Sequence, residues 1–520
     1  MNINVLALSL LSALFYVLAS PFFDLEPLGW LAIAPLIGAV TLSRSLKEAF
    51  LAGLAAGVAA YSGLCYWLIN TMVNFGGLGY LASFFFFLFL NLYLALYWAF
   101  FTLLLKKISQ RGLSLILGAP SLWVALEYLR TYLFTGHPWG LIAYTQYKNI
   151  YAIQLADCLG VYGISFILVL FSSLFFQIVA KFIREKALPF RELAMLLLLI
   201  GLTFSYGIIK VNYYKAPEKT FQAGLIQGNI DQALKWDKKY TAKTIAIYEE
   251  LSQKALRESG DLHVIIWPET AVPFYFQQPG ILRNRVMRMS GTLDSPIIFG
   301  SPAYSFKEDQ KINYLNSAFL ISPDKEKRKI EVIDRYDKIH LVPFGEYVPL
   351  KKLLFFVEKI TQGIGDFTPG KGVMTLDVEV NNSDKVKLSF GPLICYEAIF
   401  PDLVRRFVKE GANVLVNITN DGWYGKTSAP YQHLSAITFR SVENGVYMLR
   451  SANTGVTAIV DPLGRIVKET KIYEESFITG KISPSRKKTF YTRYGDLFAM
   501  FVSIIAILLL ALSIKPPNTP

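Results

Sequence analysis

Three side chains of a hydrophilic central segment, Glu269, Lys338 and Cys395, are of the types that catalyse acyl transfer. Cys395 follows an apolar, strand-like run at 388–394, Glu269 follows another at 263–267, and Lys338 precedes a turn with proline and glycine. A partly desolvated carboxylate at a strand end has a raised pKa, so it could accept a thiol proton and return it later. An ammonium close to a thiol favours the thiolate, and close to an oxyanion it stabilises a tetrahedral intermediate. Together the three residues predict a cysteine nucleophile that acts through a thioester.

Each of these residues also has an ordinary interpretation when it is taken alone. A lone cysteine is usually a small buried hydrophobic residue, a lysine a solvated surface group, and a glutamate after Trp-Pro a turn or capping residue. Cys395 is the only cysteine of the central segment, because Cys65 and Cys158 lie in or beside apolar runs, so we expect no disulfide framework. The catalytic interpretation therefore depends on the three residues occurring together.

The composition indicates a protein with a membrane part and a hydrophilic part. Hydrophobic residues make up 53% of the 520 residues and charged residues 18%, and the mean hydropathy is +0.37. This is too apolar for an ordinary soluble enzyme and too charged for a protein that lies entirely in the membrane. The net charge of +13 comes with basic residues clustered in short loops beside apolar runs. Because cytoplasmic loops of membrane proteins have this pattern, we expect no nucleic-acid binding.

Eight apolar runs are long enough, or nearly so, to cross a bilayer. The first lacks a basic stretch in front of it and is followed at once by further runs. We therefore interpret it as a retained helix and not as a signal peptide that is removed. The eight runs cover about residues 5–22, 28–43, 50–69, 80–105, 114–133, 162–181, 193–210 and 496–514.

The distribution of lysine and arginine predicts the orientation in the membrane. The loops after the second, fourth and sixth runs are basic, whereas the loop at 70–79 has no lysine or arginine and the loop at 134–161 has Lys148 alone. By the positive-inside rule, the segment after the seventh run is extracytoplasmic. We expect a seven-span domain at 1–210, an extracytoplasmic catalytic domain at 211–494, and a closing transmembrane helix with a short tail at 495–520.

The catalytic segment alternates β-branched apolar runs with amphipathic stretches. This pattern predicts strands joined by helices in an α/β layered fold, with catalytic residues at strand ends. The expected strands cover 222–227, 263–267, 296–299, 387–390 and 413–417, and the expected helices cover about 240–258, 400–410 and 429–445.

The sequence around the three residues is similar to that of a known family. Trp-Pro-Glu269-Thr, Tyr-Asp-Lys338-Ile-His-Leu-Val-Pro-Phe-Gly-Glu346 and Cys395-Tyr-Glu resemble the Glu-Lys-Cys triad motifs of the nitrilase, or carbon-nitrogen hydrolase, superfamily. The order of spans and catalytic segment resembles the membrane branch, the apolipoprotein N-acyltransferase family. The resemblance implies a polytopic helical bundle with an α-β-β-α sandwich. It makes Glu269 the general base and acid, Lys338 the oxyanion stabiliser and Cys395 the nucleophile.

The resemblance also implies supporting residues and a reaction. Trp236, Glu346, Tyr396 and Glu397 match family positions, and the stretches 420–424 and 450–455 match sequence that shapes the pocket. The backbone N–H of Tyr396 could be a second oxyanion donor. The implied reaction is ping-pong, from the sn-1 ester of a phospholipid such as phosphatidylethanolamine to the α-amine of a diacylated apolipoprotein, without cofactor or metal. The implied location is the bacterial inner membrane, with a periplasmic catalytic domain and a monomeric chain.

An apolar run bracketed by lysines at 349–360 lies inside the hydrophilic segment. Its central side chains could enter the lipid headgroup region as an interfacial lid, or the run could form an ordinary buried helix. The lid residues would be Leu353, Leu354, Phe355 and Phe356.

Other charged residues give weaker indications. Glu127 and Arg130 lie three residues apart in the fifth apolar run, which predicts a structural pair in the bundle or a group near a substrate path. The four histidines have no spacing that suits a metal site; they are His137, His263, His340 and His433. Two alternative functions remain open: a membrane-tethered amidase or nitrilase, in which water resolves the thioester, and a non-catalytic lipid-binding protein or transporter.

Overall fold

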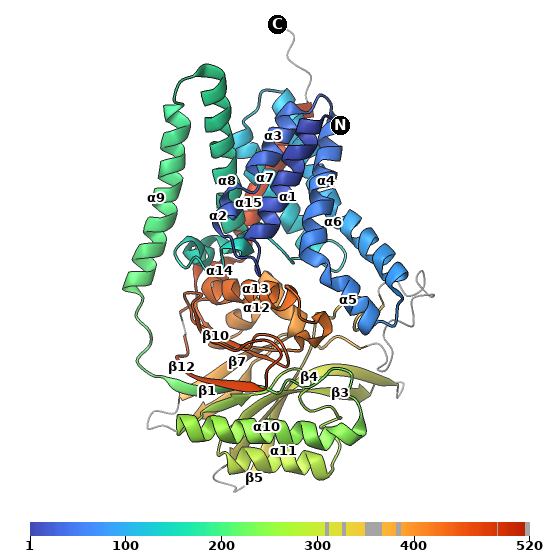
Figure 1. The fold of residues 1–520 in the computed structure, drawn as a ribbon. Coiled ribbons are helices and arrows are strands. Elements are labelled where there is room, and N and C mark those ends of the chain that lie inside the picture. The colour runs from blue at the N-terminus through green and yellow to red at the C-terminus, as the bar shows by residue number, and fades with distance from the viewer. Residues whose placement is uncertain (307–310, 325–328, 349–366, 381–385, 486, 515–520) are drawn as a thin grey trace.

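The computed structural model describes residues 1–306, 311–324, 329–348, 367–380, 386–485 and 487–514. Figure 1 shows two parts, a bundle of helices and a domain of two β-sheets beneath it. The expected lid residues Leu353, Leu354, Phe355 and Phe356 lie outside the described residues, so the lid remains a prediction.

Helices form at all eight apolar runs. The bundle consists of α1 (Ile3–Ala19), α2 (Pro27–Leu31), α3 (Ala34–Leu42), α4 (Leu46–Cys65), α5 (Trp67–Asn74), α6 (Tyr80–Gln110), α7 (Leu115–Tyr132), α8 (Ala156–Glu185), α9 (Phe190–Tyr213) and α15 (Leu497–Ile514), with short 3-10 helices at Ile142–Gln146 and Ala152–Leu155. Small residues allow close packing between α4 and α6. A Cβ added at Gly57 would lie 2.7 Å from the Cα of Ala95, so a larger side chain at Gly57 would push these helices apart.

Five helices in the described part of the chain are long and apolar enough to cross a membrane. They are α4, α6, α8 with the 3-10 turn before it, α9 and α15. The expected number of eight is not clearly reached: α1 has 17 residues, and the second run is broken into α2 and α3. Glu127 and Arg130 make α7 less apolar. The structure therefore supports a polytopic membrane protein with at least these five candidate spans.

Two six-stranded sheets form the second part. One has the order β12-β1-β2-β3-β4-β5 and the other the order β11-β10-β9-β8-β7-β6. The central strands of each sheet are parallel, namely β1 to β3 in one and β7 to β9 in the other, and the outer strands pair antiparallel. The strands are β1 (Phe221–Gln227), β2 (Val264–Ile266), β3 (Ile297–Phe306), β4 (Ile312–Asp324), β5 (Lys329–Asp337), β6 (Leu376–Val380), β7 (Val386–Ile394), β8 (Val414–Thr419), β9 (Tyr447–Ala452), β10 (Ala458–Val460), β11 (Ile466–Glu469) and β12 (Ser476–Ile482).

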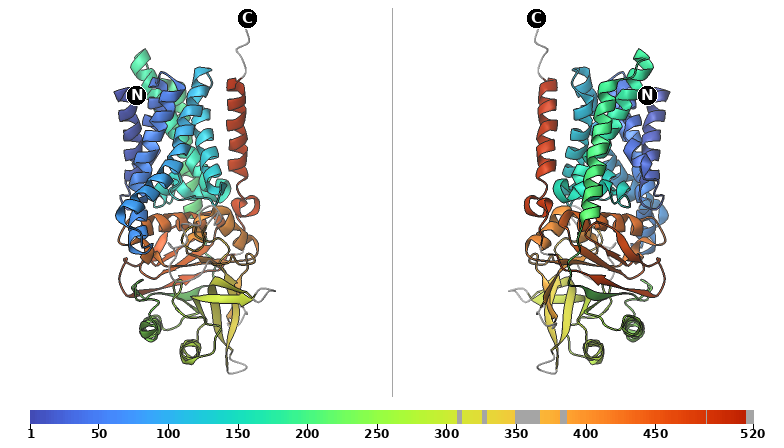
Figure 2. Two further views of the ribbon diagram at one scale, coloured as in Figure 1. Left: turned by 90° about the vertical axis from the view of Figure 1, so that its right-hand side faces the viewer. Right: turned by 90° about the vertical axis from the view of Figure 1, so that its left-hand side faces the viewer.

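Helices cover the outer faces of the two sheets. The helices α10 (Lys238–Ser259) and α11 (Ile281–Thr292) lie on the face away from the bundle, and α12 (Pro401–Lys409) and α13 (Ala429–Asn444) lie between the sheets and the bundle (Figures 1 and 2). This is the α-β-β-α sandwich that the resemblance implied. The five expected strands coincide with β1, β2, β3, β7 and β8, and the three expected helices with α10, α12 and α13. The short helix α14 (Phe490–Tyr494) leads into α15.

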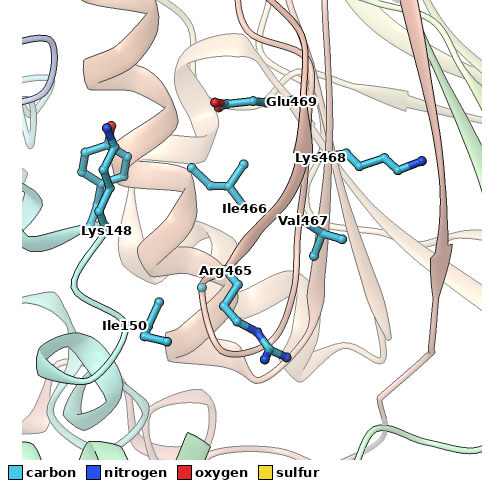
Figure 3. A pocket seen from close by; sticks show the side chains of 9 residues that line it. Lys148, Ile150, Arg465, Ile466, Val467, Lys468 and Glu469 are labelled. Atoms are coloured by element: carbon cyan, nitrogen blue, oxygen red, sulfur yellow. The ribbon is translucent and has the colours of Figure 1, made fainter.

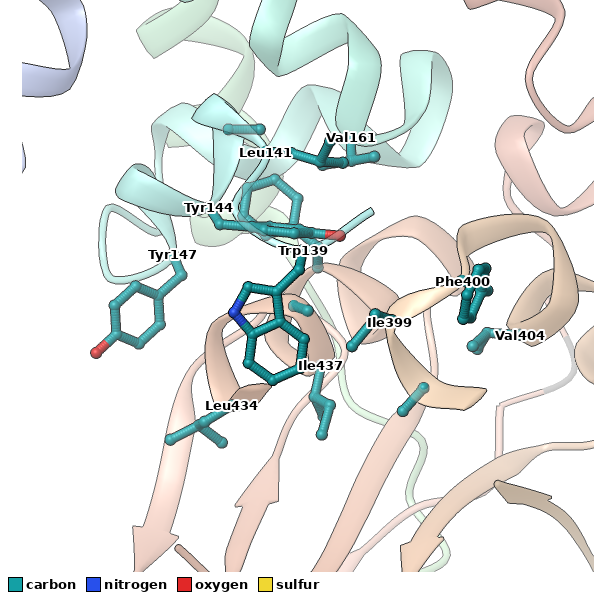
Figure 4. Close-up of a cluster of buried hydrophobic side chains, with 14 of the residues drawn as sticks. Trp139, Leu141, Tyr144, Tyr147, Val161, Ile399, Phe400, Val404, Leu434 and Ile437 are labelled. Atoms are coloured by element: carbon teal, nitrogen blue, oxygen red, sulfur yellow. The ribbon is translucent and has the colours of Figure 1, made fainter. Parts of the chain in front are cut away.

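The bundle and the sandwich share a hydrophobic core. Figure 4 shows Trp139 and Tyr144, from the connection between α7 and α8, above Leu434 and Ile437 of α13. A buried hydrogen bond from the Val161 N–H of α8 to Glu443 of α13, 2.9 Å long, crosses the same junction. These contacts fix the sandwich against the bundle through its inner helix layer.

Candidate active site

The structure brings the three predicted catalytic residues together. Glu269 follows β2, Lys338 directly follows β5, and Cys395 directly follows β7. All three are buried, with exposures of 7%, 1% and 5%. Electrostatic interactions connect Cys395 with both Glu269 and Lys338. Three residues that are distributed over more than 120 positions of the sequence therefore lie together at the strand ends of the two sheets.

Cys395 has a strained backbone. Its φ of 53° lies in the left-handed region, which residues other than glycine rarely adopt, and a 3-10 helix, Cys395–Ile399, begins at this residue. The Cys395 carbonyl accepts a hydrogen bond from the Asn417 amide, 3.3 Å long, and lies 3.2 Å from His433 Nε2. The other ring nitrogen, Nδ1, lies 3.3 Å from Asp421 Oδ1, so the imidazole bridges the Cys395 carbonyl and the Asp421 carboxylate. Two side chains thus hold the nucleophile's backbone.

A buried cluster holds those two side chains in turn. Arg450 donates to Asn417 Oδ1 over 2.6 Å and forms an ion pair with Asp421, and its Nη2 lies 3.3 Å from His433 Nδ1. Burial opposes ionisation of Asp421, but Arg450 and His433 together outweigh it and lower the pKa of the carboxyl to about 2. Burial and the positive charge of Arg450 lower the pKa of His433. The predicted pocket stretches 420–424 and 450–455 therefore support the backbone of Cys395 indirectly, through Asn417 and His433.

The charges of the site suit proton transfer from the thiol. Burial and the nearby Glu269 carboxylate raise the pKa of Cys395 to about 12, although Lys338 opposes the rise. The free thiol is therefore protonated at neutral pH and needs a base. Burial raises the pKa of Glu269, against the effect of Lys338. A carboxylate of raised basicity beside a protonated thiol is the arrangement that general base catalysis needs.

Glu346 and an unpredicted residue, Asn316 of β4, complete this group. The Lys338 ammonium lies 2.8 Å from Glu346 Oε2, and the two amide hydrogens of Asn316 bind Glu269 and Glu346, each over 2.8 Å. Burial opposes the charge on Lys338, but the carboxylates of Glu346 and Glu269 outweigh it and raise the pKa of Lys338. The signal for Asn316 in the sequence is a polar residue within an apolar strand, and its partners could not be read from it.

Tyr396 and Glu397 also lie at the site, in supporting positions. Glu397 accepts hydrogen bonds from the Tyr336 hydroxyl and from the backbone N–H groups of Ile339 and Ile394, over 2.7 to 2.8 Å, so it ties the segment of Lys338 to that of Cys395. The Tyr396 hydroxyl donates to the Gly136 carbonyl over 3.2 Å, which joins the site to the bundle.

Trp236 lies at the outside of the site. Its side chain is 43% exposed, in the loop between β1 and α10. The residue before it, Lys235, is 1% exposed, and its ammonium donates a hydrogen bond to the Glu269 carbonyl over 3.0 Å. The motif in the sequence indicated Trp236 and not Lys235, because only the folded loop shows which of the two neighbours is buried.

Glu127 and Arg130 do not form the expected pair in the described structure. Glu127 accepts a hydrogen bond from the Ile142 N–H over 2.9 Å, and the Arg130 guanidinium lies over the ring of Tyr61, 5.5 Å from its centre. Both residues line a small cavity of about 20 Å³ inside the bundle, with aromatic side chains around it. Each of the two charged groups therefore has a different partner in the bundle.

A surface cleft of about 390 Å³ lies apart from these residues. Figure 3 shows its walls, formed by Lys148 and Ile150 on one side and by residues 465–469 on the other. It contains none of Glu269, Lys338 and Cys395, so the candidate active site is a different place.

Known protein families match both parts of the chain. The model for the N-terminal domain of apolipoprotein N-acyltransferase matches residues 12–174, and the carbon-nitrogen hydrolase model matches residues 222–490. The apolipoprotein N-acyltransferase of Geobacter metallireducens is 42% identical over 496 residues, which cover 95% of this chain and 92% of that protein. The chain belongs to the apolipoprotein N-acyltransferase family. The family member from Haemophilus influenzae is 31% identical over 512 residues, covering 96% of this chain and 93% of the relative.

Solved structures of the nitrilase superfamily match about half of the chain. A branch 10 member from Saccharomyces cerevisiae is 18% identical, covers 52% of this chain and 93% of its own, and has a TM-score of 0.39. An amidase from Nesterenkonia is 17% identical, covers 52% of this chain and 94% of its own, and has a TM-score of 0.36. On the evidence of the sequence matches, this member of the apolipoprotein N-acyltransferase family is a membrane acyltransferase with a carbon-nitrogen hydrolase domain.

Proposed function

We propose that the protein transfers an acyl chain from the sn-1 position of a phospholipid, through a thioester on Cys395, to the α-amine of a diacylglyceryl-cysteine at the N-terminus of an apolipoprotein. The name shared by the relatives, apolipoprotein N-acyltransferase, supports the acceptor. The observation that carries the mechanism is the buried group of Glu269, Lys338 and Cys395 around a strained nucleophile.

The first half-reaction forms the acyl-enzyme. Glu269 takes the proton of the Cys395 thiol, and the sulfur attacks the carbonyl carbon of the ester, whose oxygen becomes an oxyanion. Lys338 stabilises this oxyanion, together with the backbone N–H of Tyr396. When the intermediate collapses, the bond to the lysophospholipid oxygen breaks, and Glu269 returns its proton to that oxygen.

The second half-reaction moves the acyl group to nitrogen. The neutral α-amine of the acceptor attacks the thioester carbonyl, Glu269 accepts a proton from the nitrogen, and the carbon-sulfur bond breaks. An amide forms and the thiol of Cys395 is regenerated by the proton on Glu269. We assign contacts with the lipid substrates to Trp236, which is exposed beside the buried Lys235, and to Tyr396, whose hydroxyl bonds to the bundle.

The bundle supports lipid substrates. An isolated soluble domain would have to extract each acyl chain from the bilayer at about 0.8 kcal/mol per CH₂. Here the hydrogen bond from Tyr396 to Gly136 brings the site to the foot of the bundle, so the chains can remain among the helices. Phosphatidylethanolamine as the donor, a monomeric state and lateral entry at a lid of residues 353–356 are part of this proposal.

The distribution of charge supports the orientation. We infer eight passes through the bacterial inner membrane, with a periplasmic catalytic domain formed by about residues 211–494. In Figure 1, α1 begins and α15 ends at the end of the bundle away from the sheets. The basic connections α3 to α4, α6 to α7 and α8 to α9 lie at the same end, as the positive-inside rule requires of a cytoplasmic face.

An acceptor experiment separates this function from that of an amidase or nitrilase. Purified protein carrying the acyl group on Cys395 is mixed with a diacylated lipopeptide, and mass spectrometry follows both molecules. We expect the lipopeptide to gain one acyl chain while the protein loses it, and the same lipopeptide with an acetylated α-amine to leave the adduct in place. If the adduct instead disappears at the same rate with either peptide or with buffer alone, water resolves the thioester and the protein is a hydrolase.

A further inference from the structure

A second buried lysine lies in the site beside the predicted triad. Lys235 comes from the loop between β1 and α10, its side chain is 1% exposed, and its Nζ donates to the backbone carbonyl of Glu269 over 3.0 Å. It interacts electrostatically with the Glu269 carboxylate and with Cys395. Neither half-reaction described above uses this ammonium.

Hydrogen bonds fix the backbone of the loop that carries Lys235. The backbone carbonyl of Asn453 accepts a hydrogen bond from the Asn229 N–H, and its side-chain oxygen accepts one from the Ile230 N–H, each 2.9 Å long. Gln232 accepts a hydrogen bond from Asn420, and the N–H of Lys235 itself bonds to the Asp231 carbonyl over 3.0 Å. The loop is therefore tied to the same two stretches, 420–424 and 450–455, that support Cys395.

The charge of Lys235 lacks a partner of its own. A buried ammonium is strongly destabilised unless nearby charges or hydrogen bonds compensate it. Lys338 has Glu346 at 2.8 Å, whereas Lys235 forms no ion pair and makes one hydrogen bond within the described part of the chain. Burial lowers the pKa of Lys235 to about 8, although the negative charge of Glu269, and that of Cys395 once its thiol is ionised, oppose the decrease. The groups whose negative charge favours the Lys235 ammonium are therefore the same two groups, Glu269 and Cys395, between which the proton moves in the proposed reaction.

We propose that Lys235 is a positioning residue of the acyl-transfer site, which compensates the charge that passes between Glu269 and Cys395 and fixes the backbone of Glu269. The proposal rests on the proposed function. Lys235 remains an ammonium in both half-reactions, and no bond to its nitrogen forms or breaks. Lys338, which is held by its ion pair with Glu346, then stabilises the oxyanion, and Lys235 compensates the charge of Glu269 and Cys395.

The pH dependence of acylation distinguishes the effect of Lys235 from that of the neighbouring titratable groups. The titratable groups that act on Lys235, Glu269 or Cys395 include Lys338, Glu346, Asp421 and Tyr424. Burial raises the pKa of Tyr424 and of Cys395, to about 12 for the thiol, whereas Arg450 and His433 hold the pKa of Asp421 near 2 in spite of burial. Lys235, with a pKa of about 8, loses its positive charge as the pH rises through that value. Acyl-enzyme formation should therefore slow above about pH 8.

The test measures the rate of acyl-enzyme formation in a single turnover with phospholipid in mixed micelles, from pH 6 to pH 10. Lys235→Gln keeps a hydrogen-bond donor but removes the charge, and at pH 7 we expect a rate lower by on the order of 10- to 100-fold. Lys235→Arg keeps the charge at every pH used, so the decrease above pH 8 should disappear. Lys239→Gln, at an exposed position of α10, is the matched control and should match the wild type.

The outcomes separate the possible roles. If Lys235→Gln acylates within twofold of the wild type, the hydrogen bond alone matters and the charge role is wrong. If Lys235→Gln does not fold, the pH profile of the wild type is decisive. A wild-type acylation rate that does not decrease between pH 7 and pH 10 overturns the proposal. A decrease that is also seen in Lys239→Gln, and is therefore not caused by that exposed lysine, supports it. Failure of the proposed function gives a different result, because the wild type would then form no acyl adduct at any pH.

Discussion

Replacing Glu269 with glutamine is expected to slow acyl-enzyme formation by about 10²- to 10⁴-fold, the range typical of a lost general base. The amide has almost the shape of the carboxyl group, so Asn316 can still donate to the remaining side-chain oxygen. What is lost is the basic oxygen. Among the described residues, Glu269 Oε2 has no hydrogen-bond partner, so it is free to receive the thiol proton of Cys395.

The measurement is quenched-flow acylation with phospholipid in micelles, followed by separation of the acylated protein. Glu258→Gln, at an exposed position near the end of α10, is the matched control and should leave the rate unchanged. Because burial raises the pKa of Glu269 and the carboxylate is the active form, the wild-type rate should fall as the pH is lowered through that raised pKa. A Glu269→Gln rate within tenfold of the wild type would show that another group takes the proton.

Arg450→Met is expected to destabilise the catalytic domain by about 3 to 5 kcal/mol, because it leaves the buried Asp421 carboxylate without its partner. For a domain of this size, such a loss corresponds to a thermal unfolding midpoint lower by about 5 to 15 °C in detergent. The backbone of Cys395 would also lose part of its support, since Arg450 orients both Asn417 and His433.

The pH dependence provides a second check on this cluster. The pKa of Asp421 lies near 2, below that of an unfolded chain, so the ion pair stabilises the fold above about pH 4 and its contribution is lost as the pH falls toward 2. The difference between wild type and Arg450→Met should therefore shrink on acidification. Arg285→Met, which breaks a partly exposed pair with Glu249, is the control and should cost about 1 kcal/mol or less. Equal effects of the two substitutions would contradict the account.

The sequence predicted where the three candidate residues lie, but not the network around them. Lys338 and Cys395 directly follow strands and Glu269 stands three residues after the end of β2, and side chains at such positions reach a sheet edge; their catalytic roles remain a prediction. Asn316, Lys235 and His433 could not be found. Their roles depend on contacts with Glu269, Glu346 and Cys395, which are 30 to 47 residues away in the sequence, and no local pattern encodes such contacts.

The membrane part shows the same limit. Hydropathy located all eight helical segments, because apolar length is a local property. It did not predict that the run at 28–43 breaks into α2 and α3, or that Glu127 and Arg130 bind different partners. Burial inside a bundle decides which polar side chains meet, and burial is a property of the packed structure.

The proposed mechanism requires that Cys395 carry an acyl group taken from a lipid. Its most direct test is the intact mass of the purified protein after incubation with phospholipid of one known acyl chain. We expect a mass increase of one such chain, which hydroxylamine removes and which is absent from Cys395→Ala. A wild-type protein that gains no acyl mass, or an adduct of equal amount on Cys395→Ala, would contradict the thioester mechanism.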